Sequence, residues 1–319
     1  MNAFCRGGHS AAPFDVVSME EKIIDLLKRR GPLTGSELRG ALGSDSFQLW
    51  KSCRQSSNLV IRMLGTRYLR LDQRVDGFAR LSPSILREFL TYSVIGLSSE
   101  AKTLEQKAQE IISHINDVSK YKFNLAQSLI STIMSRLESP DAIDQQLCVI
   151  IAGDIVYDMA HDVPRPERST GRMVTGSDLD LIVILDDTVP EDVLQKLDSA
   201  IYQEKYRNLI NPAVKEEIDY IVKRFERVRE QVAFDDFKKM VACKIIQEGK
   251  LLYGSESLFK AAKSLLNECG VTGKLEAMQQ RAEVFRKDAE EYLLNEHHEG
   301  LDRDNLYLFY TAEESEEFE

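Results

Sequence analysis

The stretch GSDLDLIVILDD, residues 176–187, places two aspartates one residue apart, directly before a run of aliphatic side chains. The run LIVIL has the length and composition of a buried β-strand. Side chains two residues apart in a strand project from the same face, so Asp178 and Asp180 are predicted to point together. Two carboxylates on one face repel each other in an apolar setting, and a divalent cation removes that cost. The stretch therefore predicts a metal site at the start of a buried strand.

A third carboxylate follows in AVKEEIDYIVKRFERV, where Asp219 lies within the next predicted strand. Three carboxylates from neighbouring strands allow two ions to lie about 3.5–4 Å apart, the arrangement used for in-line phosphoryl chemistry. Asp178, Asp180 and Asp219 are therefore the predicted metal ligands and catalytic residues, with two Mg²⁺ or Mn²⁺ ions. Glu217 shares a face with Asp219, so it is either an acid that assists at the site or a surface acid, and we favour the surface acid.

Upstream of these residues, the apolar run Leu147–Ala152 predicts a partner strand that ends in Gly153-Asp154. The order of Gly153, the GSDLD segment and Asp219 resembles the minimal type of DNA polymerase β-like nucleotidyltransferase. Members of that family have an apolar strand ending in Gly-Ser, a helix, a small residue with Asp-x-Asp on the next strand, and a later third acidic residue. The segment ACKIIQEGKLLYGSESL is similar to the stretch that closes many of them. The resemblance spans about residues 145–270, with the nucleotidyltransferase domain itself at 145–255.

This resemblance implies a mixed sheet with helices on one side, and transfer of an NMP from an NTP to a hydroxyl acceptor on a protein, an RNA or a small molecule. In the family's pattern Asp178 and Asp180 hold both ions, and Asp219 holds the second ion beside the acceptor. Similar domain pairings occur in toxin–antitoxin and defence settings. The residues that the resemblance places against the nucleotide are Gly153, Asp154, Gly176, Ser177 and Lys244.

One position departs from the family's pattern, because Asp154 stands where the family has a serine. The loop after it is longer than in minimal members and carries Arg165, Arg168 and Arg172. Either one of these arginines or the segment Ser169-Thr170-Gly171 replaces the lost phosphate contact, or Asp154 marks a degenerate domain that binds nucleotides without turnover. The second reading makes the protein a nucleic-acid-binding regulator that senses nucleotides.

The N-terminal part, residues 19–82, has the element order of a winged helix-turn-helix. A helix over residues 19–30 is followed by a second helix with Thr34 or Ser36 as its N-cap, and by a third in DSFQLWKSCRQ. Two short β-like runs in LVIRMLGTRYLRL then predict a hairpin that turns at Gly65. In this fold the third helix is the recognition helix and the Gly65 turn is the wing.

The charge of the N-terminal part favours contact with DNA or RNA. Residues 19–94 contain 13 Lys and Arg against 8 Asp and Glu, whereas the whole chain has a net charge of −11. A basic segment in an acidic protein is typical of a nucleic-acid interface, although such modules also dock proteins. The candidate nucleic-acid-binding residues are Lys51, Arg54, Gln55, Arg62, Arg67 and Arg70.

The remaining segments complete an α+β protein of several parts. We expect a flexible leader at 1–18, a helical connector at 83–144 that includes SILREFLTYSVIGL and two further helices, C-terminal helices at 256–310, and an acidic disordered tail at 311–319. No apolar run reaches the length of a membrane helix, which predicts a protein without a membrane partner. The five cysteines are scattered, which is typical of reduced thiols in a cytoplasmic protein.

Overall fold

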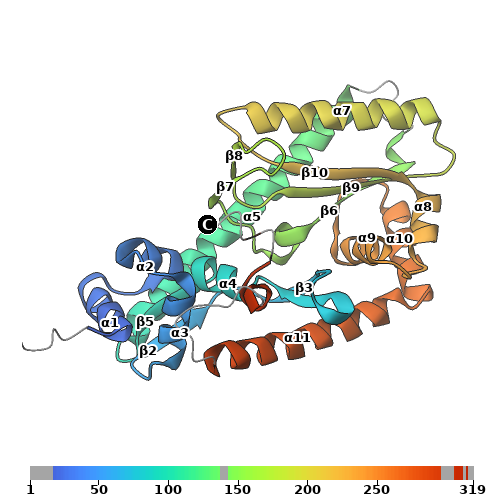
Figure 1. Cartoon of the computed structure of the whole chain (residues 1–319). Helices are drawn as coiled ribbons and strands as arrows, with labels where there is room; N and C mark the ends of the chain where they lie inside the picture. The colour runs from blue at the N-terminus through green and yellow to red at the C-terminus, as the bar shows by residue number, and fades with distance from the viewer. Residues whose placement is uncertain (1–16, 137–142, 296–304, 312–313, 315–319) are drawn as a thin grey trace, which may run out of the picture.

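The computed structural model describes residues 17–136, 143–295, 305–311 and 314 of the 319-residue chain. It combines α-helices with small β-sheets, in agreement with the predicted α+β class. Figure 1 shows a group of short helices at one end and the large β-sheet at the other, with the long helices α5 (Ala101–Ser135) and α11 (Val271–Asn295) running between them. Most of the predicted leader lies outside the described residues. Within the described part of the chain, no helix is both long and apolar enough to cross a membrane.

Three helices open the fold as the sequence predicts: α1 (Met19–Arg30), α2 (Gly35–Leu42) and α3 (Ser46–Gln55). The Thr34 side chain accepts a hydrogen bond from the Glu37 amide and so caps α2, and Gly43 ends that helix in the left-handed conformation. Capping at both ends therefore fixes the short helix that precedes the predicted recognition helix α3.

The predicted hairpin at Gly65 is wrong, because the two strands beside this turn pair with other partners. Strand β2 (Leu59–Met63) pairs with β5 (Ser93–Leu97), which also pairs with β1 (Leu33–Thr34). Strand β3 (Tyr68–Leu71) pairs instead with β4 (Ala79–Ser82). The β3–β4 hairpin buries Leu69 and Leu81 against the C-terminal helices and the large sheet, and this burial favours the alternative pairing.

The predicted helical connector contains a strand and one long helix. Helix α4 (Ile85–Thr91) is followed by β5, so the prediction of a helix over SVIGL is wrong. The β-branched pair Val94 and Ile95 is completely buried, and it suits a central strand better than a helix. The two further helices predicted here are a single helix, α5 (Ala101–Ser135), which contains no glycine or proline to interrupt it.

The large sheet has the strand order β10 (Ile218–Arg224), β9 (Leu179–Leu185), β6 (Leu147–Ala152) and β11 (Lys250–Gly254). Strands β9 and β10 are parallel and are joined by α7 (Glu191–Ile210), whereas the other pairs are antiparallel. The predicted run of buried aliphatic residues in β9 is confirmed, since Leu181 to Leu185 are all buried.

Helices cover both faces of this sheet, which corrects the expectation of helices on one side. Side chains of α5 and α7 pack on the face formed by Leu181 and Val183. The other face, formed by Ile182 and Ile184, packs against α9 (Phe237–Glu248), α10 (Glu256–Glu268) and α11 (Val271–Asn295), with α8 (Phe225–Gln231) beside them. Both faces of β9 are therefore buried along most of its length.

Two C-terminal features connect the ends of the molecule. Helix α11 runs beneath the β3–β4 hairpin (Figure 1), and its Ala289 and Leu293 reach the core of the N-terminal helices. The short helix α12 (Leu306–Phe309) inserts Phe309 against Phe47 and Trp50 of α3. In the predicted disordered tail, Thr311 and Glu314 are buried, which contradicts that prediction for these two positions. The other tail residues lie outside the described part of the chain.

Candidate functional site

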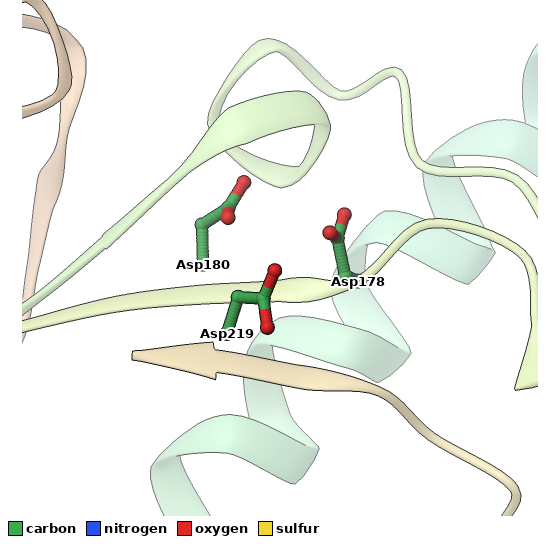
Figure 2. Close-up of side chains that lie close together, drawn as sticks. All are labelled: Asp178, Asp180 and Asp219. Carbon is green, nitrogen blue, oxygen red and sulfur yellow. The ribbon is translucent and has the colours of Figure 1, made fainter. Parts of the chain in front are cut away.

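Strands β9 and β10 bring the three predicted metal ligands together. Asp178 immediately precedes β9, Asp180 is its second residue, and the parallel register places Asp219 beside Asp180. Each of the three side chains offers a carboxylate oxygen, and these oxygens all lie within 4.8 Å of one another. Figure 2 shows the three carboxylates facing a common space beside the sheet. The predicted convergence of these residues is confirmed.

The electrostatics of the cluster favour a bound cation. Burial raises the pKa of Asp178 against the opposing charge of Arg165, and the negative charges of Asp219 and Asp154 add to the rise. Burial and the negative charges of Asp178 and Asp219 raise the pKa of Asp180 well above its ordinary value. Both shifts express the cost of holding like charges together away from water. A hard divalent cation such as Mg²⁺ takes oxygen ligands and offsets this cost, so the donor set fits the predicted metal.

Two glycines allow the backbone to approach the cluster closely. Gly153 has φ +73°, and a Cβ atom at this position would lie 2.3 Å from Oδ2 of Asp180. Gly176 has φ +64°, and a Cβ atom there would lie 1.8 Å from the carbonyl oxygen of His161. Any side chain at either position would displace the loop that carries Asp178 or the carboxylate of Asp180. These glycines therefore shape the site through its backbone.

Asp154, the residue that departs from the family's pattern, is anchored by two hydroxyl groups. It accepts a hydrogen bond from the Tyr68 hydroxyl and a second, of 2.7 Å, from Oγ of Ser177. Burial alone would raise the pKa of Asp154, but His161, Arg87 and these two hydrogen bonds hold it below its ordinary value. The carboxylate therefore joins β3 to the loop before Asp178.

The aspartates line one wall of a cavity of about 610 Å³. Its other walls come from the 3-10 helix Gly153–Tyr157, from α9, from the β3–β4 hairpin and its loop, and from α4 and the C-terminal segment. Cationic side chains share these walls with eight carboxylates, the three aspartates among them, and a cavity that combines both charges fits a metal-bound phosphate ligand. The cationic residues in the lining are Arg70, Arg74, Arg87, Arg165, Arg168 and Lys244.

Arg165 of the long loop reaches the aspartates. Its guanidinium forms an ion pair of 2.8 Å with Glu217 and one of 3.8 Å with Asp178, and its Nε donates a hydrogen bond of 2.8 Å to the carbonyl of Gly176. Glu217 is only 8% exposed, so its interpretation as a surface acid is wrong. It is the buried partner that orients Arg165 toward the cluster.

Two lysines form ion pairs with acidic residues at the edges of the site. Lys244, predicted to contact the nucleotide, lines the cavity and forms a 2.5 Å ion pair with Glu248. Lys205 of α7 reaches across the edge of the sheet and pairs with Asp219 at 2.9 Å. The Asp219 side chain is 53% exposed, which makes its side the more open approach to the cluster.

The candidate nucleic-acid-binding residues do not form one surface. Arg54 pairs with Glu290 of α11, and the Gln55 amide donates to a backbone carbonyl of the same helix. Arg67 is held by Glu88 and Glu290, and Arg62 pairs with Glu105 of α5. Arg70 lies in the cavity, and the Lys51 ammonium lies 5.6 Å from the ring centre of Phe47. Most of these cations therefore stabilise contacts between the N-terminal helices and the rest of the chain.

Three further residues belong to the site although the sequence predicted no role for them: Tyr68, Arg87 and Glu248. Tyr68 binds Asp154, Arg87 lines the cavity, and Glu248 accepts a hydrogen bond of 2.8 Å from Tyr157 while it pairs with Lys244. Glu248 lies in the segment ACKIIQEGKLLYGSESL, from which only Lys244 was predicted to contact the nucleotide, whereas Tyr68 and Arg87 lie in no motif with the aspartates. Tyr68 and Arg87 come from elements that only tertiary packing brings to the sheet, so no local pattern marks them.

Comparisons with known proteins name no family for this chain. No known family model matches the sequence, and no curated protein matches it. The functional interpretation therefore rests on the residues of the site and on their geometry.

Proposed function

We propose that this protein is a metal-dependent nucleotidyltransferase that transfers an NMP from an NTP to a hydroxyl acceptor. The observation that carries the proposal is the convergence of Asp178, Asp180 and Asp219 at one wall of a cavity with cationic side chains. The strand order β10-β9-β6-β11, with Asp180 and Asp219 in register on adjacent strands, supports a polymerase β-like domain.

In this proposal Asp178 and Asp180 hold both Mg²⁺ or Mn²⁺ ions, and Asp219 holds the second. The ions supply charge neutralisation of the phosphates and of the leaving pyrophosphate. Arg165, Arg168 and Lys244 bind the phosphate oxygens that face the cavity. Since Asp219 is the most exposed of the three, the acceptor enters beside it. The acceptor oxygen forms a bond to the α-phosphorus, the bond to pyrophosphate breaks, and the acceptor proton passes to the Asp219 carboxylate.

The contacts of Asp154 favour an active nucleotidyltransferase over a degenerate domain that binds nucleotides without turnover. The Asp154 carboxylate already accepts hydrogen bonds from Tyr68 and Ser177, so its charge is engaged within the protein. The nearby Arg165 and Arg168 line the cavity and provide the phosphate contact that the family's serine would give. The alternative, a nucleotide-sensing regulator without turnover, keeps the same binding residues and differs only in the absence of transfer.

The N-terminal segment supports a winged-helix module with an unusual wing region. Helices α1 to α3 and the sheet β1-β5-β2 have the order of that fold, and the residues between β2 and β5 carry the β3–β4 hairpin and α4. Because this hairpin lines the cavity, the module's role includes completing the nucleotide site.

The proposal is tested with NTPs labelled at the α-phosphate, each incubated with Mg²⁺ or Mn²⁺, the protein and a cell lysate as the source of acceptors. We expect covalent labelling of one acceptor class, and its loss in Asp178→Asn and Asp180→Asn. The matched control is Asp192→Asn, which changes an aspartate on the exposed surface of α7 and should retain transfer. Nucleotide binding without labelling from any of the four NTPs would contradict the enzyme and favour the regulator.

A further inference from the structure

Glu314 is a buried carboxylate in the wall of the same cavity. It is 1% exposed, and the cavity is lined by Glu314 together with Arg70 and Arg87. Nε of Arg87 donates a hydrogen bond of 3.0 Å to Oε1 of Glu314. The backbone amide of Thr311 donates another, of 3.0 Å, to Oε2. One anionic group is thus held by donors on two sides.

The surroundings of Glu314 are those of a site for an oxyanion. The Ser84 hydroxyl also donates to this carboxylate, and the charge of Arg70 acts on it. Burial opposes ionisation, yet Arg87, Arg70 and these hydrogen bonds keep the pKa of Glu314 below its ordinary value. Arginine and hydroxyl donors that hold a carboxylate also match the geometry of phosphate oxygens.

Arg87 is linked to the metal-binding loop through His161. An Nη of Arg87 donates to Nε2 of His161, at 2.9 Å. The His161 amide donates to Oγ of Ser177, at 3.2 Å, and Ser177 directly precedes Asp178. The anion held by Arg87 therefore lies one short chain of hydrogen bonds from the candidate metal ligands.

We infer that Arg87 and Ser84, with the charge of Arg70, form a phosphate-binding site that Glu314 occupies when no ligand is bound. The ligand is a phosphate group, carried either by a nucleoside triphosphate or by free pyrophosphate. The choice of phosphate over another anion rests on the proposed function, because a metal site in the same cavity is suited to phosphate esters. The presence of an anion site at Arg87 rests on the contacts of Glu314 alone.

Glu314 then competes with the ligand from within the chain. A tethered group acts at an effective concentration on the order of millimolar. It therefore weakens the binding of any anion that needs the same hydrogen-bond donors. Removing its charge should therefore tighten phosphate binding by about tenfold or more. The gain should require Arg87, since Arg87 is the donor that Glu314 releases.

The test is isothermal titration calorimetry of the full chain with pyrophosphate, and separately with ATP and Mg²⁺. Glu314→Ala is expected to bind about tenfold more tightly than the unmodified chain in at least one of the two titrations. A gain with pyrophosphate assigns the site to a free phosphate anion, and a gain with ATP alone assigns it to a phosphate carried by the nucleotide. Glu314→Gln keeps the size of the side chain and carries the test if the alanine variant does not fold.

Two further variants make the result decisive. Glu105→Gln removes an exposed carboxylate that pairs with Arg62 away from the cavity, and it should leave both affinities unchanged. Arg87→Met in the Glu314→Gln background should abolish the gain. Equal affinities in the unmodified chain and both Glu314 variants, or a gain that survives Arg87→Met, would overturn the inference. Both outcomes are binding affinities, so they can be interpreted whether or not the protein transfers a nucleotide.

Discussion

Tyr68 donates its phenolic hydrogen to Asp154, so a strand of the N-terminal segment anchors the carboxylate beside the candidate metal site. The Tyr68 ring also stacks on Tyr157, with 4.0 Å between ring centres. Through these two contacts the β3–β4 hairpin and the large sheet form one structural unit.

Replacing Tyr68 with phenylalanine should therefore destabilise the fold by about 1–3 kcal/mol, because the buried Asp154 carboxylate loses one of its donors. Chemical denaturation at pH 7 measures this change. The matched control is Tyr121→Phe, at a tyrosine that is 56% exposed, and it should change the free energy of unfolding by less than about 0.5 kcal/mol. Equal effects of the two substitutions would show that the Asp154 contact contributes nothing to stability.

Asp180→Asn should make the metal-free protein more stable by about 1 kcal/mol, because it removes one of three mutually repelling charges. The same change should abolish stabilisation by Mg²⁺, which for the unmodified chain reaches about 2.7 kcal/mol at a hundred times the dissociation constant. Thermal melting with EDTA and with Mg²⁺ measures both effects. Asp192→Asn should respond to Mg²⁺ as the unmodified chain does, and a Mg²⁺ response retained by Asp180→Asn would exclude Asp180 as a ligand.

Stability should fall with pH below about 6.5 because of His161. Burial and the neighbouring Arg87 lower the pKa of this histidine to about 3. Between pH 6.5 and 3 the unfolded chain binds a proton that the folded chain excludes, so the free energy of unfolding decreases by about 1.4 kcal/mol per pH unit. Above pH 6.5 the contribution is constant. Urea denaturation of the unmodified chain and of His161→Gln at pH 7.5, 6.0 and 5.0 should show a steeper loss for the unmodified chain, and parallel curves would contradict this assignment.

Arg67→Met should cost about 2 kcal/mol of stability, because Arg67 is bound at 2.6 and 2.8 Å to the buried Glu88. Arg62→Met is the matched comparison: its ion pair with Glu105 is exposed and should contribute less than about 1 kcal/mol. Urea denaturation distinguishes the two. If both variants are equally stable, Arg67 is not a structural residue, and its place among the nucleic-acid-binding candidates is strengthened.

The metal cluster could be predicted from sequence because two local rules determine it. Alternation along a strand puts Asp178 and Asp180 on one face, and a strand–helix–strand connection makes the next strand parallel and adjacent. The register between the two strands then decides whether Asp219 lies beside Asp180. The cap at Thr34 was predictable for the same reason, since its partner Glu37 lies three residues away.

Features that depend on distant partners could not be predicted. The segment SVIGL is too short for its periodicity to distinguish a strand from a helix, and its strand character depends on β1 and β2. The Tyr68–Asp154 contact joins residues 86 positions apart in the chain. The burial of Glu217 depends on Arg165, which reaches it from a loop that has no regular pattern.

The origin of the cavity walls has a practical consequence for dissecting this protein. A fragment cut at residue 144 would keep Asp178, Asp180 and Asp219 but would lose Tyr68, Arg70 and Arg87. Its metal ligands would face solvent where the hairpin now stands, and Asp154 would be left without its tyrosine donor. The smallest unit that can be expressed with an intact site therefore begins in the N-terminal segment, and activity lost from a shorter fragment says nothing about the three aspartates.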